Sequence, residues 1–375
     1  MTGTTPEAAR DAIPPAYLET GFPAFVPTAE GRDGPDDTLA RLNLNEAMVP
    51  PSPAALDAAR AALDHVHRYP DDYGTALKQS LSDHLDVAPE ALHLGCGSSE
   101  LLFAAVRISV GAGDHAVLPD PTFPICAKTI VQTGGRMTQV PVRADGANDV
   151  DAMLAALTPE TRLLYICTPN NPTGADLDES DLAQVIAGVP DTCLLVIDEA
   201  YVEFAIAQGG ADALSLIGAR KGPWMITRTF SKAYSLSGLR VGYAIASEGE
   251  VTQALNQLRA AFTVNRPALA AARAALADQD YLADTLRQTI AAREDLAAAL
   301  AELDCLVLPS RANFVTIRPR SVPAKTLAEQ ARDADILVQA MPWPDDLGSL
   351  RITVGTPAQK EALLAVLRAA MAMAT

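Results

Sequence analysis

Between residues 91 and 247 the chain alternates short apolar runs with longer stretches in which apolar residues recur at intervals of three and four. Short apolar runs predict strands, and the longer pattern predicts amphipathic helices. This alternation is typical of β-α units, so we expect an α/β fold with a mostly parallel, doubly wound sheet and helices on both faces. The predicted strands are residues 116–118, 163–167, 194–197, 224–227 and 241–246, and two of the predicted helices are residues 99–110 and 179–186.

A different pattern begins beyond residue 251, where an Ala-rich helical stretch at 268–303 follows the break Asn265-Arg266-Pro267. Two further strands, at 313–317 and 350–354, and a closing helix at 357–373 are predicted after it. A chain of 375 residues exceeds what one core usually serves. We therefore predict an N-terminal segment (1–45) that packs with the small domain, a large domain (46–264) and a smaller α/β C-terminal domain (265–375).

Charge and composition exclude several classes of function. The net charge of -17 at pH 7 repels phosphate backbones, so we expect no nucleic-acid partner. We also expect no membrane association and a cytoplasmic location, because long apolar runs and the apolar core of a secretory signal are missing. The five cysteines and five histidines lack the spacing of a disulfide framework or of metal ligands, so neither is expected.

The segment from Thr229 to Arg240 carries the clearest chemical signal. Lys232 follows a predicted strand, where open α/β sheets place their ligands, and Arg240 stands eight residues later. Hydroxyl side chains flank the lysine. This layout suits an amine that forms an imine beside an anion site. A single lysine is more often a solvated surface residue, so the interpretation depends on what other segments bring to the same sheet edge.

Two more polar residues follow predicted strands. Asp198 comes directly after residues 194–197, where a carboxylate can keep a pyridine nitrogen protonated and so make the ring an electron sink. Asn171 lies in the turn after residues 163–167 and presents a side-chain amide. Taken separately, the aspartate could be a cap or turn residue, and the asparagine turn indicates no function.

A glycine-containing segment, Gly95-Cys96-Gly97-Ser98-Ser99-Glu100, lies between a short strand and a helix. Its backbone N–H groups and the helix dipole would face an anion. The pattern starts like a dinucleotide fingerprint, but Glu100 replaces the third glycine. A phosphate monoester is therefore the better fit.

Four strings occur in order and with plausible spacing: Pro169 to Gly174, Asp198 to Tyr201, Ser231 to Arg240, and Leu350 to Thr356. Together they resemble the fold-type I aminotransferases of class I/II, in particular the histidinol-phosphate aminotransferase branch, from about Asn43 to the C-terminus. The resemblance implies the PLP-transferase fold type I and pyridoxal 5'-phosphate as cofactor. It also implies transfer of an amino group between an amino acid and a 2-oxo acid.

The resemblance further implies roles in a cofactor site. Lys232 would hold the cofactor as an imine, and Asp198 would pair with its ring nitrogen. Asn171 and Tyr201 would hydrogen-bond the phenolic oxygen of the ring, and Phe123 would stack on the ring where the branch usually has tyrosine. The residues that would hold the phosphate are Ser98, Ser99, Ser231 and Arg240.

Two further matches concern the neighbouring subunit and the substrate. Tyr69 matches a tyrosine that reaches the phosphate of the neighbouring subunit's cofactor, which implies a homodimer with shared sites. Arg351 matches the arginine that binds the substrate α-carboxylate through a bidentate pair. Phe123 could instead belong to the core, and Tyr69 could be a buried hydroxyl.

One departure from the family bears on the substrate. Members that act on histidinol phosphate carry a second arginine upstream of the one matched by Arg351, and Gln339 takes its place in an alignment that needs a one-residue gap. A neutral amide cannot replace a guanidinium that binds a phosphate dianion. The segment after Asn45 also lacks the usual N-P-Y-G pattern. We therefore expect a non-phosphorylated amino acid, bound through Arg351, as the main substrate. The alternative is that another cation binds the phosphate.

Other reactions remain open on the sequence alone. Decarboxylases, eliminases and oxidases of this fold use the same cofactor-binding residues, which do not choose the bond that breaks. A nicotinamide-dependent dehydrogenase would need the intact glycine fingerprint that the chain lacks. A non-catalytic binding protein is difficult to reconcile with the lysine and the aspartate together.

Overall fold

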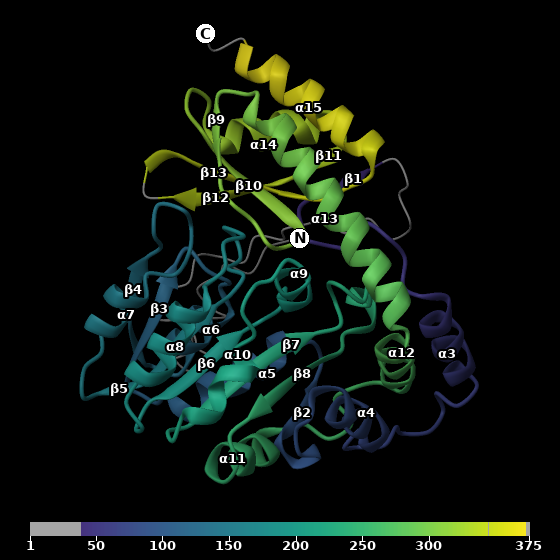
Figure 1. Ribbon diagram of the computed structural model, residues 1–375, viewed down its shortest axis with the longest axis vertical. Coiled ribbons are helices and arrows are strands. Elements are labelled where there is room, and N and C mark those ends of the chain that lie inside the picture. Colours follow the sequence, from purple (N-terminus) through teal and green to yellow (C-terminus); the bar gives the residue numbers. More distant parts are fainter. Residues whose placement is uncertain (1–38, 344, 373–375) are drawn as a thin grey trace, which may run out of the picture.

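The computed structural model describes residues 39–343 and 345–372, so most of the predicted N-terminal segment, residues 1–38, lies outside it. Figure 1 shows a larger body around one sheet and a smaller body around another, with the long helix α13 (Gln279–Ala301) running from one toward the other. The prediction of an α/β fold with a mostly parallel sheet and a smaller α/β unit is confirmed.

Within the described residues the large sheet has seven strands in the order β2-β8-β7-β6-β5-β3-β4, and β8 runs antiparallel to both its neighbours. The strands are β2 (Leu92–Gly95), β3 (His115–Asp120), β4 (Arg136–Pro141), β5 (Thr161–Cys167), β6 (Leu194–Asp198), β7 (Trp224–Thr229) and β8 (Gly242–Ala246). All five predicted strands of this region overlap one of them. β4 was not predicted, because its residues are mostly polar and exposed and form no apolar run.

Helices cover both faces of this sheet. One face packs against α5 (Ser98–Ser109), α6 (Ile125–Gln132) and α11 (Glu250–Leu258). The other packs against α3 (Pro53–Leu63), α4 (Thr75–Leu85), α7 (Val150–Ala155), α8 (Glu179–Gly188), α9 (Val202–Ile206), α10 (Ala213–Leu216) and α12 (Arg266–Ala277). Local sequence starts several of these helices: the Asp178 carboxylate accepts from the Asp181 N–H at α8, and the Asn265 side chain accepts from the Ala268 N–H at α12.

The smaller body is built on an antiparallel sheet in the order β12-β13-β10-β9. Its strands are β9 (Cys305–Val307), β10 (Phe314–Pro319), β12 (Gln339–Trp343) and β13 (Asp345–Thr353), and its helices are α14 (Ala324–Asp333) and α15 (Pro357–Ala372). β1 (Ala40–Arg41) pairs in parallel with β11 (Ile336–Leu337), and Leu42 is buried in the core of this body. The described end of the N-terminal segment therefore packs here.

The helical stretch expected at 268–303 is two helices. α12 and α13 separate at Asp278, whose carboxylate accepts from the Tyr281 N–H and so begins α13. The buried alanines of α12 belong to the core of the larger body, and α13 contributes Leu282 to that core and Leu300 to the smaller one. Small side chains let α12 pack into the larger body. We therefore propose that the boundary lies within α13, later than the residue 265 expected from the sequence.

Each helix of the described residues is too short or too polar to cross a bilayer, and these residues hold no cluster of three His, Cys, Asp or Glu that could bind a metal ion.

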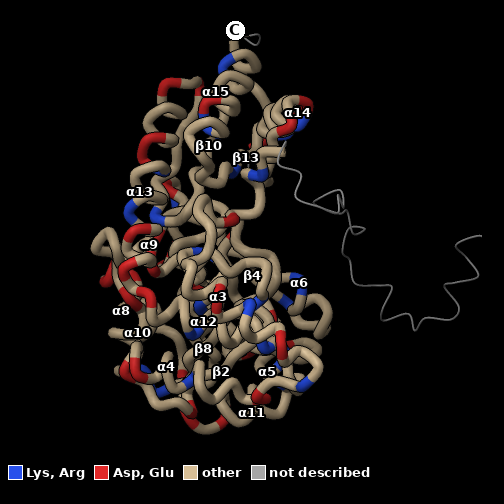
Figure 2. The backbone as a smooth tube through the Cα atoms, turned by 90° about the vertical axis from the view of Figure 1, so that its right-hand side faces the viewer, with Lys and Arg blue, Asp and Glu red and all other residues tan. Residues whose placement is uncertain are grey.

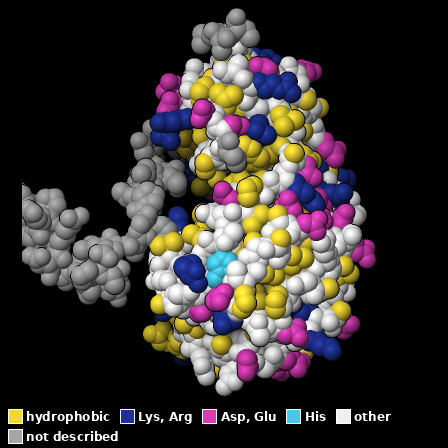
Figure 3. All heavy atoms as spheres, turned by 90° about the vertical axis from the view of Figure 1, so that its left-hand side faces the viewer, with side chains coloured by type: hydrophobic (Ala, Val, Ile, Leu, Met, Phe, Trp, Pro, Cys, Tyr) yellow, Lys and Arg dark blue, Asp and Glu magenta, His cyan; other side chains and the backbone are white. Residues whose placement is uncertain are grey.

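Many acidic positions lie along the side formed by α13, α9, α8 and α10 (Figure 2). On the face seen in Figure 3, basic and acidic side chains are interspersed among apolar ones.

Candidate active site

The site lies at the carboxyl ends of β3, β5, β6 and β7. The chain goes from β3 outward to β4 and returns to β5 on the other side of β3, and open α/β sheets bind ligands at such a change of direction. A cavity of about 410 Å³ opens here, which suits a cofactor together with a small substrate. The predicted residues that line it are Ser98, Ser99, Phe123, Asn171, Asp198, Tyr201, Ser231, Lys232, Arg240 and Arg351.

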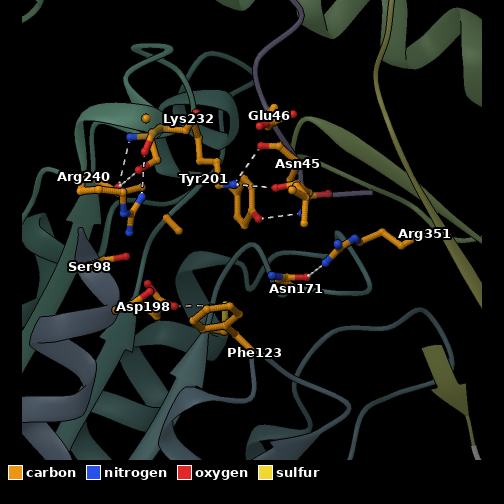
Figure 4. A pocket seen from close by; sticks show the side chains of 18 residues that line it. Asn45, Glu46, Ser98, Phe123, Asn171, Asp198, Tyr201, Lys232, Arg240 and Arg351 are labelled. Atoms are coloured by element: carbon orange, nitrogen blue, oxygen red, sulfur yellow. Dashed lines mark hydrogen bonds between the residues drawn. The ribbon is translucent and has the colours of Figure 1, made fainter. Parts of the chain in front are cut away.

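Figure 4 shows how these side chains are distributed. Arg240 and Ser98 lie at one end of the view, and Arg351 and Asn171 lie at the other. Lys232 and Tyr201 stand between the two ends. The cavity therefore has two separated cationic ends with an amine between them.

Lys232 follows β7 and reaches into the cavity. Its Nζ donates to the backbone oxygen of Asn45 at 2.8 Å and to that of Leu44 at 3.2 Å. Burial, reinforced by the positive charge of Arg351, lowers the pKa of Lys232 to about 7. A large share of the side chain is therefore uncharged at neutral pH, which is the form that can attack an aldehyde.

Asp198 ends β6 and is only 2% exposed. Its Oδ1 accepts a hydrogen bond from the Thr227 hydroxyl at 2.9 Å, and its Oδ2 accepts one from the Tyr165 hydroxyl at 3.2 Å. No lysine or arginine of the described residues forms an ion pair with it. Burial raises the pKa of Asp198 to about 6, against the opposing effect of hydrogen bonds from Thr227, Tyr165 and the Cys167 thiol. A cation brought into the cavity, such as a protonated ring nitrogen, would compensate this buried charge.

A candidate anion site lies at the N-terminus of α5. The helix has no side-chain cap there, so its first N–H groups are open to an acceptor. Gly97 has a φ of 75°, and a side chain at this position would overlap with the guanidinium of Arg240. The buried hydroxyl of Ser231 accepts a hydrogen bond from the Thr229 hydroxyl at 3.0 Å. A helix N-terminus, a guanidinium and hydroxyl groups together fit a phosphate monoester.

Arg351 lies on β13 and is 8% exposed. Its Nη1 donates to Asn171 Oδ1 at 2.6 Å, and its Nη2 donates to the backbone oxygen of Asn43. Its buried Nε has no hydrogen-bond partner among the described residues. Because buried polar groups normally have partners, this arginine is suited to bind a ligand carboxylate, to which its N–H groups would donate.

Residues 43–46, which we name the strap, also form part of the site; the sequence indicated only that the segment after Asn45 departs from the family pattern, and not which residues the strap contacts. Asn45 adopts a left-handed backbone with a φ of 53°, and its amide Nδ2 donates to the Tyr201 hydroxyl at 2.9 Å. Its backbone N–H donates to the Thr353 hydroxyl at 2.9 Å, and Asn313 donates to its backbone oxygen at 3.1 Å. The strap thus touches both the lysine and the arginine of the cavity. The alternation of leucine and asparagine over residues 42–45 is a weak local signal for these contacts.

Two predicted residues lie outside the cavity of their own chain. Tyr69 is 77% exposed, and its ring stacks on Phe262 with 4.4 Å between the ring centres. Gln339 stands opposite Arg351 in the β12–β13 ladder, but its Nε2 donates to the neighbouring Ala340 carbonyl and it does not line the cavity. The structure therefore does not bring Gln339 to the site, because its amide is bonded back to its own strand.

The residues present fit pyridoxal 5'-phosphate. The α5 N-terminus with Arg240 and its neighbouring hydroxyl groups suits the phosphate, and the partly uncharged Lys232 suits the aldehyde. Asp198, which has no ion-pair partner among the described residues, suits the ring nitrogen. Phe123 lines the same cavity and offers an aromatic surface.

Comparisons with known proteins agree with this site. The family model described as "Aminotransferase class I and II" matches residues 38–367. An aromatic amino acid aminotransferase of Rhodococcus jostii is 38% identical over 93% of this chain and 94% of its own. Histidinol-phosphate aminotransferase 2 of Caulobacter vibrioides is 37% identical over 89% of this chain and 87% of its own.

A solved structure is similar over nearly the whole chain. The histidinol-phosphate aminotransferase of Sinorhizobium meliloti, crystallised in complex with pyridoxal 5'-phosphate, has a TM-score of 0.83 and 31% identity, and the match covers 93% of this chain and 99% of that one. Neither the dehydrogenase alternative nor a different cofactor is compatible with a family match of this length. The chain therefore belongs to the aminotransferase class I and II family, and it is a pyridoxal 5'-phosphate-dependent transaminase of fold type I.

Proposed function

We propose that this transaminase acts on a free, non-phosphorylated amino acid and a 2-oxo acid, and that histidinol phosphate is not its main substrate. The supporting observation concerns the cations of the cavity. Among the described residues only Lys232, Arg240 and Arg351 supply lysine or arginine to its lining. If Lys232 and Arg240 serve the cofactor, Arg351 alone remains for the substrate. One guanidinium balances the single charge of a carboxylate, whereas it would leave part of the charge of a phosphate dianion uncompensated.

The similarity to known enzymes does not distinguish between these substrates, because the two relatives named above carry different substrate names at 38% and 37% identity. The argument therefore depends on the cavity, which Gln339 does not line and to which it adds no charge.

The same proposal assigns a role to each cavity residue. Ser98, Ser99, Ser231 and Arg240 hold the cofactor phosphate at the α5 end. Asp198 accepts from the ring N–H, and Phe123 stacks on the ring. Asn171 and Tyr201 bond its phenolic oxygen. Arg351 binds the α-carboxylate of the substrate at the opposite end of the cavity.

When bound, pyridoxal 5'-phosphate supplies an aldehyde that condenses with amines and a protonated ring that accepts the electron pair of a broken Cα–H bond. Lys232 Nζ would hold the cofactor through its aldehyde carbon. As a free amine it would be the base for the proton of the substrate α-carbon, and in its protonated form the acid that returns this proton to the former aldehyde carbon. Its lowered pKa suits both roles, because burial favours the uncharged amine that can accept a proton. Arg351 keeps the α-carbon within reach of this amine.

We further propose that the enzyme is a cytoplasmic homodimer in which Tyr69 reaches the cofactor phosphate of the neighbouring subunit. Its 77% exposure and its position outside its own cavity support this role, since a tyrosine that served its own site would line it.

The proposal is tested by single-turnover conversion of the cofactor to its amine form, followed by absorbance. The panel contains phenylalanine, tyrosine, glutamate, alanine and histidinol phosphate. We expect a free amino acid to react fastest. Arg351→Gln should raise the concentration for half-maximal rate by roughly 30-fold or more, because a buried charge partner is lost.

Arg287→Gln provides a matched control, since this arginine is exposed on α13 and its ion pair within the described residues is with Asp284. It should leave the half-maximal concentration unchanged. A faster reaction with histidinol phosphate than with every free amino acid would overturn the proposal.

A further inference from the structure

The surroundings of Asp198 contain two residues that cofactor chemistry does not by itself require. At the carboxyl ends of β5, β6 and β7, Cys167, Asp198 and Thr227 stand side by side in register. Tyr165 lies two residues before Cys167 and so on the same face of the sheet. The strand register therefore brings a phenol and a threonine hydroxyl to one carboxylate.

Both donors are completely buried. Tyr165 and Thr227 each have 0% exposure, and the face around them is formed by apolar residues such as Val196 and Met225. A phenol buried at such a place normally needs a polar partner, and the Tyr165 hydroxyl donates to Asp198 Oδ2. The Thr227 hydroxyl donates to Oδ1. The Cys167 thiol also donates weakly to Oδ2, with 3.9 Å between Sγ and Oδ2. All hydrogen bonds to the carboxylate thus come from uncharged groups.

Uncharged donors have a consequence that an arginine would not have. They orient the carboxylate and favour its ionised form, yet they leave its negative charge uncompensated. The charge then remains available for a cation that enters the cavity. A guanidinium in the same place would neutralise it beforehand.

We infer that Tyr165 and Thr227 are positioning residues, which hold the Asp198 carboxylate ionised and oriented toward the ring nitrogen of the cofactor. The inference rests on the proposed role of Asp198. It predicts that either hydroxyl contributes to cofactor affinity through Asp198 and not through packing.

The experiment measures the dissociation constant of pyridoxal 5'-phosphate for the apoprotein by equilibrium dialysis. Tyr165→Phe keeps the ring and removes the hydroxyl, and it should weaken binding about ten-fold, as expected for one hydrogen bond to a charged group. Thr227→Val should have a similar effect, whereas Thr227→Ser keeps the donor and should restore near-native affinity. Tyr243→Phe, a buried tyrosine of β8 outside this cluster, is the matched control and should not change affinity.

A double-mutant cycle separates the inference from simple packing. In an Asp198→Asn background, Tyr165→Phe should change the dissociation constant little, since the carboxylate through which it acts is gone. An equal loss in both backgrounds, or no loss in the native one, would overturn the inference.

The cycle also keeps the two proposals apart. If Asp198→Asn itself bound the cofactor as tightly as the native protein, the proposed site would be wrong, and the inference with it. If Asp198→Asn weakened binding while Tyr165→Phe did not, only the inference would fail. Should Tyr165→Phe not fold, the contrast between Thr227→Val and Thr227→Ser decides the question: equal affinities of these two would refute it.

Discussion

At the scale of single residues, burial favours the uncharged form of both Lys232 and Asp198, with opposite consequences. For Lys232 the loss of hydration yields a free amine near neutral pH, which the proposed chemistry needs. For Asp198 the loss of hydration disfavours the negative charge that would pair with the ring nitrogen. The hydrogen bonds from Thr227 and Tyr165 favour that charge and so oppose the effect of burial. The same physical effect therefore helps one group and must be offset at the other.

The pH dependence of cofactor capture tests the lysine. Only the uncharged amine attacks an aldehyde, so capture should be slow below the pKa of Lys232 and reach a plateau above it. We expect the rate at which borohydride traps pyridoxal 5'-phosphate on the apoprotein to rise with pH with a midpoint of about 7. If Lys232 had an ordinary pKa, the trapping rate would instead rise with a midpoint of about 10.4.

Two variants make this measurement specific. Lys232→Ala should trap no cofactor at the site, whereas Lys325→Ala removes an exposed lysine of α14 and should behave as the native protein. A midpoint near 10, or persistent trapping in Lys232→Ala, would contradict the assignment.

At the scale of elements, the segment that carries Tyr69 is fixed by contacts with the segment between α11 and α12. Arg259 donates to both oxygens of Asp72 at 2.8 Å and lies over the Tyr73 ring at 4.6 Å. The Phe262 N–H donates to Asp72 at 2.6 Å. Phe262 in turn stacks on Tyr69. The bidentate pair of Arg259 and Asp72 thus joins the two segments that carry Tyr69 and Phe262, and Arg266 adds a hydrogen bond to the Tyr69 backbone oxygen at 2.6 Å.

Arg259→Lys tests this arrangement. A lysine keeps the charge but loses the planar fork, so it cannot bond both carboxylate oxygens in the same way. We expect a lower melting temperature and weaker cofactor affinity, because Tyr69 loses its fixed position. The control is Arg287→Lys, in an exposed ion pair of α13, which should change neither quantity. Equal effects of the two substitutions would show that the segment is held by other contacts.

At the scale of the whole molecule, the site joins two bodies and is proposed to need two chains. Lys232 and Asp198 come from the larger body, Arg351 comes from the smaller one, and the strap and α13 connect them. Leu63, Val66, Tyr69 and Tyr73 are all more than half exposed. Large apolar side chains close together in the sequence and exposed to this extent are typical of a surface that another protein covers.

Hybrid dimers test the shared site. A subunit with Tyr69→Phe is mixed with one that carries Lys232→Ala, after mild dissociation and reassociation. Each hybrid should contain one site with both lesions and one site with neither. We expect the activity of the mixture to exceed the sum of the separate variants. No gain, although hybrids form, would place Tyr69 in its own subunit's site or outside any site.

The sequence by itself determined the features that depend on neighbouring residues. Alternating apolar runs predicted the strands, and polar residues directly after them predicted which side chains meet, since parallel strands end at one edge of the sheet. Asn171, Asp198 and Lys232 all line the cavity for this reason. Four ordered strings were enough to indicate the family, because such strings are short and local.

Only the tertiary structure decided what depends on distant segments. Asn45 meets Thr353 across 308 positions of the chain, and Tyr165 meets Asp198 through the register of β5 and β6. The packing of α12 into the larger body likewise depends on its fit to α3. Such contacts leave no period or motif in the sequence, because each partner looks like an ordinary core or turn residue until the chain brings the two together.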